Sequence, residues 1–220
     1  MYYKLLISNI IGHGFLDFYN PYFKNNIDFL KTYLLIIFLN LIWLFTFSGT
    51  NILIFIIFSF KHFGDDMVYL TNDTNLLNLG STLFLCTIIN DYQIWYDILN
   101  ILADNHIHHI IIVSSMMGLL SVYNIRKNIL GIKILICQLI LSKILGLYNF
   151  ILIYMNIFHI PIALHKIYIL NGKKPILLHL LLLFLVYQIP LIINKLTLRI
   201  GISIVNAHMI IRYEEPRKVL

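Results

Sequence analysis

The sequence has 220 residues, of which 60% are apolar and only 12% are charged. Soluble domains carry about 25% charged and about 45–50% apolar residues. Together with a mean hydropathy of +0.84, this composition excludes a disordered chain, a solvated globular enzyme and a disulfide scaffold. It predicts an all-α integral membrane protein forming one membrane domain over residues 1–220. The net charge is +6, but the basic residues are scattered between apolar runs, so we expect no nucleic-acid binding.

The first part of the chain predicts one transmembrane helix and one interfacial helix. Residues 1–31 contain chain breakers and predict an interfacial N-terminal segment. The apolar run 32–60 is about 44 Å long as a helix, enough for one crossing, and we expect a bend or break near Gly49. Residues 61–80 are expected to be a polar connection. Residues 81–104 alternate apolar positions with aspartates, as in an amphipathic helix at the interface.

The second part predicts long, partly steeply tilted membrane helices. Residues 106–160 are expected to form a helical hairpin with a basic turn at 124–128 and an end at Pro161. The run 175–212 would span about 57 Å as one helix, far more than the bilayer thickness. We therefore predict a long tilted helix or a bent helix pair, with the bend at Pro190.

The acidic residues are unevenly placed. Eight aspartates lie between Asp17 and Asp104, and Glu214 and Glu215 lie near the end. No carboxylate side chain occurs from Asn105 to Tyr213, a segment that we call the carboxylate-free stretch. Buried basic groups in this stretch must find acidic partners outside it.

Most polar residues of the apolar runs have simple explanations. Cys86 and Cys137 are too far apart for a metal motif, and we expect both to be small buried residues. The ammonium groups of Lys133 and Lys143 can reach the membrane–water interface when their side chains extend along the helix surface.

Histidines invite a metal or haem interpretation that the sequence does not favour. The cluster His106, His108 and His109 has no nearby cysteine and lies near an interface, so we expect it to be solvated or lipid-facing. No two of the nine histidines occur at an obvious common membrane depth, as a haem anchor would require. We therefore predict no metal site and no cofactor.

Arg199 stands out because it lies inside an apolar helix-forming segment of the carboxylate-free stretch. At about 100° per residue, Lys195 and Ser203 lie about 40° to either side of it and Asn206 about 20° away. His208 lies on the opposite face. No acidic residue is near Arg199 in the sequence, so the sequence offers it no local carboxylate. A position at the lipid headgroups would need the helix to end near Arg199, but apolar residues follow it. We expect it to meet a carboxylate of another chain or of a distant part of this one.

The segment Leu196–Ile200, followed by Ala207-His208, resembles the signature around the essential arginine of F-type ATP synthase subunit a, in its mitochondrial form. Residues 163–175 are similar to the family's turn before the last helices, Pro190 to its proline ahead of the arginine, and residues 116–120 to its second transmembrane helix.

The resemblance implies a proton-translocating stator subunit that forms two aqueous half-channels against the rotor c-ring. Arg199 would face the rotor carboxylate and separate the half-channels. Residues implied for the proton pathway are Ser203, Asn206, His208, His179 and Lys195. His179 also fits an ordinary interior histidine. Implied partners are c-ring subunits, other stator subunits of the membrane sector and lipids such as cardiolipin. The sequence lacks a transit or secretory signal pattern, so we expect an organelle-encoded, multi-pass protein of the mitochondrial inner membrane.

The sequence departs from the family in four places. Ser203 stands where the family has asparagine, and Ala207 where it has glycine. Tyr187 and Gln188 occupy the neighbourhood of an acidic residue. The family also has a further helix after the arginine helix, which we expect another polypeptide to supply unless the chain is not a complete subunit a.

Two other classes stay open at this point. A small membrane subunit of respiratory complex I is suggested by Gly118-Leu119-Leu120 and by residues 126–130, although that subunit depends on buried glutamates. A structural accessory subunit of a respiratory assembly would explain the departures, but not the polar stripe centred on Arg199.

Overall fold

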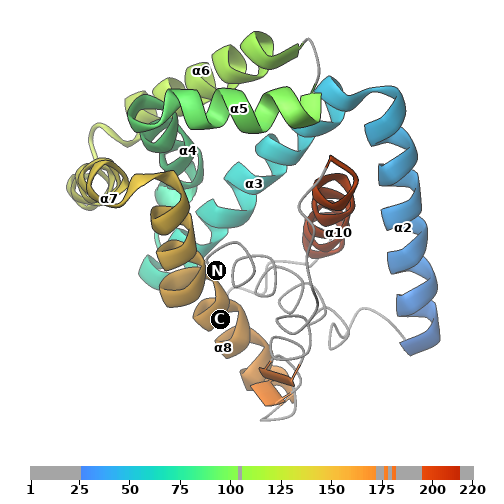
Figure 1. The fold of residues 1–220 in the computed structure, drawn as a ribbon. Coiled ribbons are helices and arrows are strands. Elements are labelled where there is room, and N and C mark those ends of the chain that lie inside the picture. Colours follow the sequence, from blue (N-terminus) through green and yellow to red (C-terminus); the bar gives the residue numbers. More distant parts are fainter. Residues whose placement is uncertain (1–25, 104–105, 172–175, 178–179, 182–194, 214–220) are drawn as a thin grey trace. The chain divides into compact units, whose positions relative to one another are not determined.

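The computed structural model describes residues 26–103, 106–171, 176–177, 180–181 and 195–213. Every regular element among them is a helix (Figure 1), which confirms the all-α prediction for this part of the chain. The chain divides into two compact units. The first unit comprises Met1–Thr46 and Ile160–Leu220, and the second comprises Phe47–His159.

Three helical segments among the described residues are long and apolar enough to cross a membrane. They are Ile27–Thr46, Ile107–Ile125 and Ile129–Lys166. These segments make the chain a helical membrane protein, as its composition predicts. The helix that carries Arg199 is not one of the three, because its polar residues lower its mean hydropathy.

The segment expected to form one helix over 32–60 forms two. Helix α2 (Asn26–Thr46) ends one residue before Phe47, whose backbone leaves the helical region, and α3 (Ser48–Thr71) follows directly. The interruption falls close to the expected position. Gly49 itself lies inside α3, where a side chain would collide with His106. Helix α3 also runs through 61–71, so the expected polar connection over 61–80 is mostly helix.

The interfacial helix expected over 81–104 is also two elements, α4 (Leu79–Asn90) and α5 (Tyr92–Ala103), which meet at Asp91. All residues of α4 from Leu79 to Ile88 are buried, so this helix belongs to the core of the second unit rather than to an interface. It packs against α3, α6 and α7. The buried residues of helix α5 lie along one face, as in an amphipathic helix.

In the region of the expected hairpin, α6 (Ile107–Ile125) and α7 (Ile129–Ile153) are joined through residues 126–128. Asn128 caps α7 by accepting a hydrogen bond from the amide of Gly131, and its own amide donates to the Asp73 carboxylate at 2.6 Å. Asp73 in turn accepts from the Asn75 amide at the start of the short helix η2 (Thr74–Asn78). These hydrogen bonds, led by the one from the Asn75 backbone, lower the pKa of Asp73.

The long apolar segment Ile129–Lys166 is interrupted at two places. Gly146 has φ of 70° and ψ of 165°, a conformation that favours glycine, and it kinks α7. Further along, Tyr154–His159 form a π-helical turn, η4, and α8 (Ile160–Asn171) begins directly after it. The expected helix end at Pro161 is therefore wrong: Pro161 lies in the first turn of α8, directly after the π-helical turn. At about 57 Å, a straight helix of 38 residues would exceed the bilayer, and the interruptions let it bend.

Glycines allow the helices of the second unit to approach closely. A methyl group on Gly80 of α4 would overlap the Phe60 carbonyl oxygen and the Gly64 amide nitrogen of α3. On Gly118 of α6 it would come within 2.6 Å of the Leu85 side chain. Small residues at helix contacts are typical of membrane bundles.

Polar side chains bridge the same helices inside the second unit. Ser81 of α4 bonds to Ser121 of α6 at 2.5 Å, and Thr82 donates to Gln138 of α7 at 2.8 Å. At the end of α4, Asn90 donates to Ser142 at 2.7 Å. The remaining polar residues of α7 differ from this pattern. Lys133 and Lys143 are exposed, and so is Cys137, contrary to the expectation of burial, whereas Cys86 is buried.

The described core of the first unit lies between α2 and α10 (Lys195–Tyr213), which lie side by side in Figure 1. Phe29 and Tyr33 of α2 stack with ring centroids 5.3 Å apart and pack against Ala207. The Tyr33 hydroxyl donates to the Ile204 carbonyl at 3.4 Å. Because the start of α2 meets the end of α10, the two helices are antiparallel.

Candidate functional site

One face of α10 is polar and buried. Arg199 is only 6% exposed, Ser203 is fully buried and Asn206 is 2% exposed. Their spacing of four and three residues places all three on one side of the helix. The exposed Ile200 lies about 100° around the helix from Arg199, and Gly201, with open space around it, lies on the side opposite the polar face. Three members of the stripe predicted around Arg199 are therefore buried on one side of the helix.

Helix α2 contacts the polar face of α10 near Arg199 and again near Asn206. The guanidinium carbon of Arg199 lies 4.8 Å from the centroid of the Phe45 ring. The Asn206 amide donates to the Asn40 side-chain carbonyl at 3.1 Å, and the Asn40 amide donates to the Ile36 carbonyl of its own helix. A guanidinium over an aromatic face is attracted by the ring quadrupole and stays charged. The arrangement therefore keeps a permanent positive charge within a buried site.

The other predicted site residues fall in three groups. His208 is buried, at 3% exposure, although it lies opposite Arg199 on the helix, because residues 207–209 are covered all round. Lys195 is the first residue of α10, and its side chain lies outside the described part. His179 and the expected bend at Pro190 also lie outside the described residues. Their predicted roles stay predictions.

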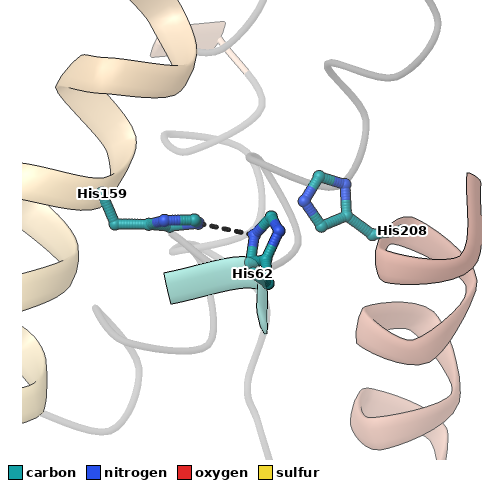
Figure 2. A group of neighbouring side chains, drawn as sticks. All are labelled: His62, His159 and His208. Carbon is teal, nitrogen blue, oxygen red and sulfur yellow. Dashed lines mark hydrogen bonds between the residues drawn. The ribbon is translucent and has the colours of Figure 1, made fainter. Parts of the chain in front are cut away.

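A second buried polar cluster lies entirely within the second unit. His159, the last residue of η4, is 2% exposed, and its Nδ1 lies 2.7 Å from Oδ2 of Asp66 on α3. Its Nε2 lies 3.2 Å from Nε2 of His62, one helical turn before Asp66 (Figure 2). The Tyr154 hydroxyl, at the start of η4, donates to the same Asp66 oxygen at 3.3 Å. The figure also draws His208, which belongs to α10 of the first unit.

The π-helical turn explains how two residues of η4 reach one carboxylate. In a regular α-helix, positions five residues apart lie about 140° apart around the axis. The wider turn of a π-helix brings Tyr154 and His159 closer to one face. Asp66, which is 3% exposed, thereby receives partners from a segment about ninety residues away in sequence.

The second cluster was not predicted from the sequence. Residues 61–80 were expected to be a polar connection, and helix α3 instead continues through them. The available signal was the spacing of His62 and Asp66, since residues four apart share one face of a helix. His159 looked like the residue before a helix-ending proline, and no local pattern connects it with Asp66.

The three histidines near the start of α6 are exposed: His106, His108 and His109. This agrees with the expectation of a solvated or lipid-facing cluster. His106 packs against Gly49 of α3, and His108 lies beside the ring of Tyr96, with centroids 5.8 Å apart.

Comparisons with models of protein families, with curated proteins and with solved structures found no match for this chain.

Proposed function

We propose that this chain is a proton-translocating stator subunit of the membrane sector of an ATP synthase, with Arg199 facing the carboxylate of a rotor c-ring. One observation carries the proposal: Arg199, Ser203 and Asn206 form a continuous buried polar face on one helix. The resemblance of residues 196–200 and 207–208 to the arginine segment of subunit a supports it.

The chemistry of an arginine suits this role. A guanidinium is not deprotonated in proteins, so it cannot pass a proton onward itself. A carboxylate brought beside it is favoured in the ionised form, because the adjacent positive charge stabilises the anion. A rotor carboxylate would therefore release its proton before it reaches Arg199 and take up a new proton after it has passed Arg199. The same charge blocks a direct leak between the two half-channels.

The neighbouring side chains suit a path for protons. Ser203 and Asn206 offer both donors and acceptors to water, and Asn40 extends this set onto α2. The imidazole of His208 can accept a proton on one nitrogen while it donates from the other. Lys195 and His179 belong to the same proposed pathway. Partners would be c-ring subunits, other stator subunits and lipids such as cardiolipin in the mitochondrial inner membrane.

Replacement of the arginine tests the proposal in the native assembly. We expect Arg199→Ala to reduce ATP synthesis driven by a proton gradient to background, measured in membranes that contain equal amounts of the assembly. The matched control is Lys133→Ala, which removes one positive charge from an exposed position on α7. It should leave coupled synthesis unchanged. Coupled synthesis that persisted in Arg199→Ala would contradict the proposal.

A photo-crosslinking residue in place of Ile200 tests the partner directly. Ile200 is 38% exposed and adjoins Arg199. We expect it to capture a small hairpin subunit that carries a membrane-embedded carboxylate. Capture of subunits of respiratory complex I would instead favour that assembly, and capture of lipid alone would favour a structural accessory role. Either result would overturn the proposal.

A further inference from the structure

The buried cluster of the second unit places two imidazole nitrogens face to face. His62 and Asp66 lie one turn apart on α3, and His159 lies at the end of η4. The Nε2 atoms of His62 and His159 are 3.2 Å apart. The aromatic ring of Phe63 lies against both, with centroids 5.7 Å from His62 and 5.2 Å from His159. Packing therefore restrains the orientation of both rings.

The hydrogen bonds around His159 determine which of its nitrogens is available. Asp66 accepts a hydrogen bond from the Tyr154 hydroxyl and lies 2.7 Å from Nδ1 of His159. An ionised Asp66 requires the proton of a neutral His159 to be on Nδ1, because a carboxylate only accepts hydrogen bonds. The lone pair of His159 is then on Nε2 and points at His62. A carboxylate that fixes the tautomer in this way is the usual support of a metal-binding histidine.

We propose that Nε2 of His62, which is half-buried, and Nε2 of His159, which is buried, are two ligands of a transition-metal site, with Zn²⁺ as the ion that fits best. Zinc–nitrogen bonds are about 2.0–2.1 Å, so two nitrogens on one tetrahedral zinc ion lie about 3.3 Å apart. The two nitrogens are already at nearly that distance. Asp66 positions His159 and does not bind the ion itself. This site departs from the sequence-based expectation that the chain holds no metal, and it does not depend on the proposed function.

The charge and chemistry of the cluster also suit a divalent cation. Neutral imidazole is a ligand for zinc, copper, iron and nickel, whereas magnesium and calcium prefer oxygen. The negative charge of Asp66 offsets part of the charge of an ion held among apolar side chains. Two histidines leave further coordination positions for water or for other donors. When the ion binds, the proton of a neutral His62 that lies between the two Nε2 atoms moves to Nδ1 of His62, so that both Nε2 lone pairs face the ion.

Metal analysis of the full-length chain in detergent tests the site. The chain is incubated with Zn²⁺, desalted and analysed for zinc by mass spectrometry. We expect about one zinc ion per chain, and a loss of most of it in His62→Gln and in His159→Gln. His109→Gln, at an exposed position of α6, is the matched control and should retain the ion. Asp66→Asn should weaken zinc affinity about 10–100-fold without removing either ligand.

Two further measurements separate a lost ligand from a lost fold. Variants are compared only where size-exclusion chromatography and the helical circular dichroism signal match the parent chain. X-ray absorption at the zinc edge should show at least two imidazole ligands in the parent chain. Zinc that is absent from the parent, or equally retained in folded His62→Gln and His159→Gln, would overturn the site. The histidine pair would then be held by a shared proton alone.

Discussion

The two units bury polar groups in different ways. In the second unit, the buried carboxylate of Asp66 is surrounded by the Tyr154 hydroxyl and the His159 ring, both supplied by the same unit. In the first unit, the buried charge belongs to Arg199, whose described neighbour on α2 is the ring of Phe45. An aromatic face attracts a cation without neutralising it.

On the two proposals above, the two buried groups serve different ends: Asp66 supports its unit and positions His159, whereas Arg199 acts in proton coupling. A carboxylate that receives hydrogen bonds from two directions contributes to the stability of its unit, so its replacement should lower that stability. On the proposed function, the positive charge of Arg199 attracts a carboxylate carried by another chain. On the proposed function, changes in the second unit should therefore act on stability, whereas Arg199→Ala should act on proton coupling.

Removal of the buried carboxylate should have the largest effect on stability. Asp66→Ala leaves the Tyr154 hydroxyl and the His159 ring without their acceptor, and we expect the free energy of unfolding to fall by about 3 kcal/mol or more. Denaturant titration of the chain in detergent measures this. The adjacent Asp65 is the control: its ion pair with Lys61, at 3.0 Å, is partly exposed. Asp65→Ala should cost about 0.5 kcal/mol or less, and equal losses would contradict a structural role for Asp66.

Replacement of a glycine by alanine should lower stability in the second unit and not in the first. Gly80→Ala places a methyl group against backbone atoms of α3, which cannot move aside as a side chain would. We expect a loss of about 2–3 kcal/mol in the same titration. A methyl group on Gly201 of α10 meets no atom within 4 Å. Gly201→Ala should be neutral or stabilise by up to about 1 kcal/mol, since alanine favours helix. A neutral Gly80→Ala would show that α3 and α4 are not in such close contact.

The smallest expected effect concerns the amide bridge between α2 and α10. Asn40→Ala removes the acceptor of the buried Asn206 amide, and we expect a loss of about 1–2 kcal/mol. Asn149 is exposed and donates to the Leu145 carbonyl of its own helix. Asn149→Ala should change stability by less than about 0.5 kcal/mol. If both variants behaved alike, the bridge would not contribute to the pairing of α2 and α10.

Periodic and compositional features were predictable from the sequence. The apolar runs predict helices that can cross a membrane, and the described part of the chain contains three such segments. The spacing of Arg199, Ser203 and Asn206 predicts a shared helix face, and all three are buried. These properties depend on residues close together in sequence, so local patterns capture them.

Features that depend on distant contacts were missed. Asp66 looked like part of a polar connection, because its partners Tyr154 and His159 are about ninety residues away. The kink at Gly146 was not expected either, since a lone glycine in an apolar run carries no local signal of a left-handed conformation. Cys137 was expected to be buried because its neighbours are apolar, yet in a membrane helix apolar residues also face outward.

The π-helical turn η4 (Tyr154–His159) holds one residue more than an α-helical turn needs. Deletion of a single codon within 155–158 would remove that extra residue and keep both Tyr154 and the histidine. In the α-helical turn that results, these two residues are four apart and lie about 40° from each other around the axis, so both still share one face. In-frame loss of three nucleotides here should therefore be less damaging than replacement of the histidine.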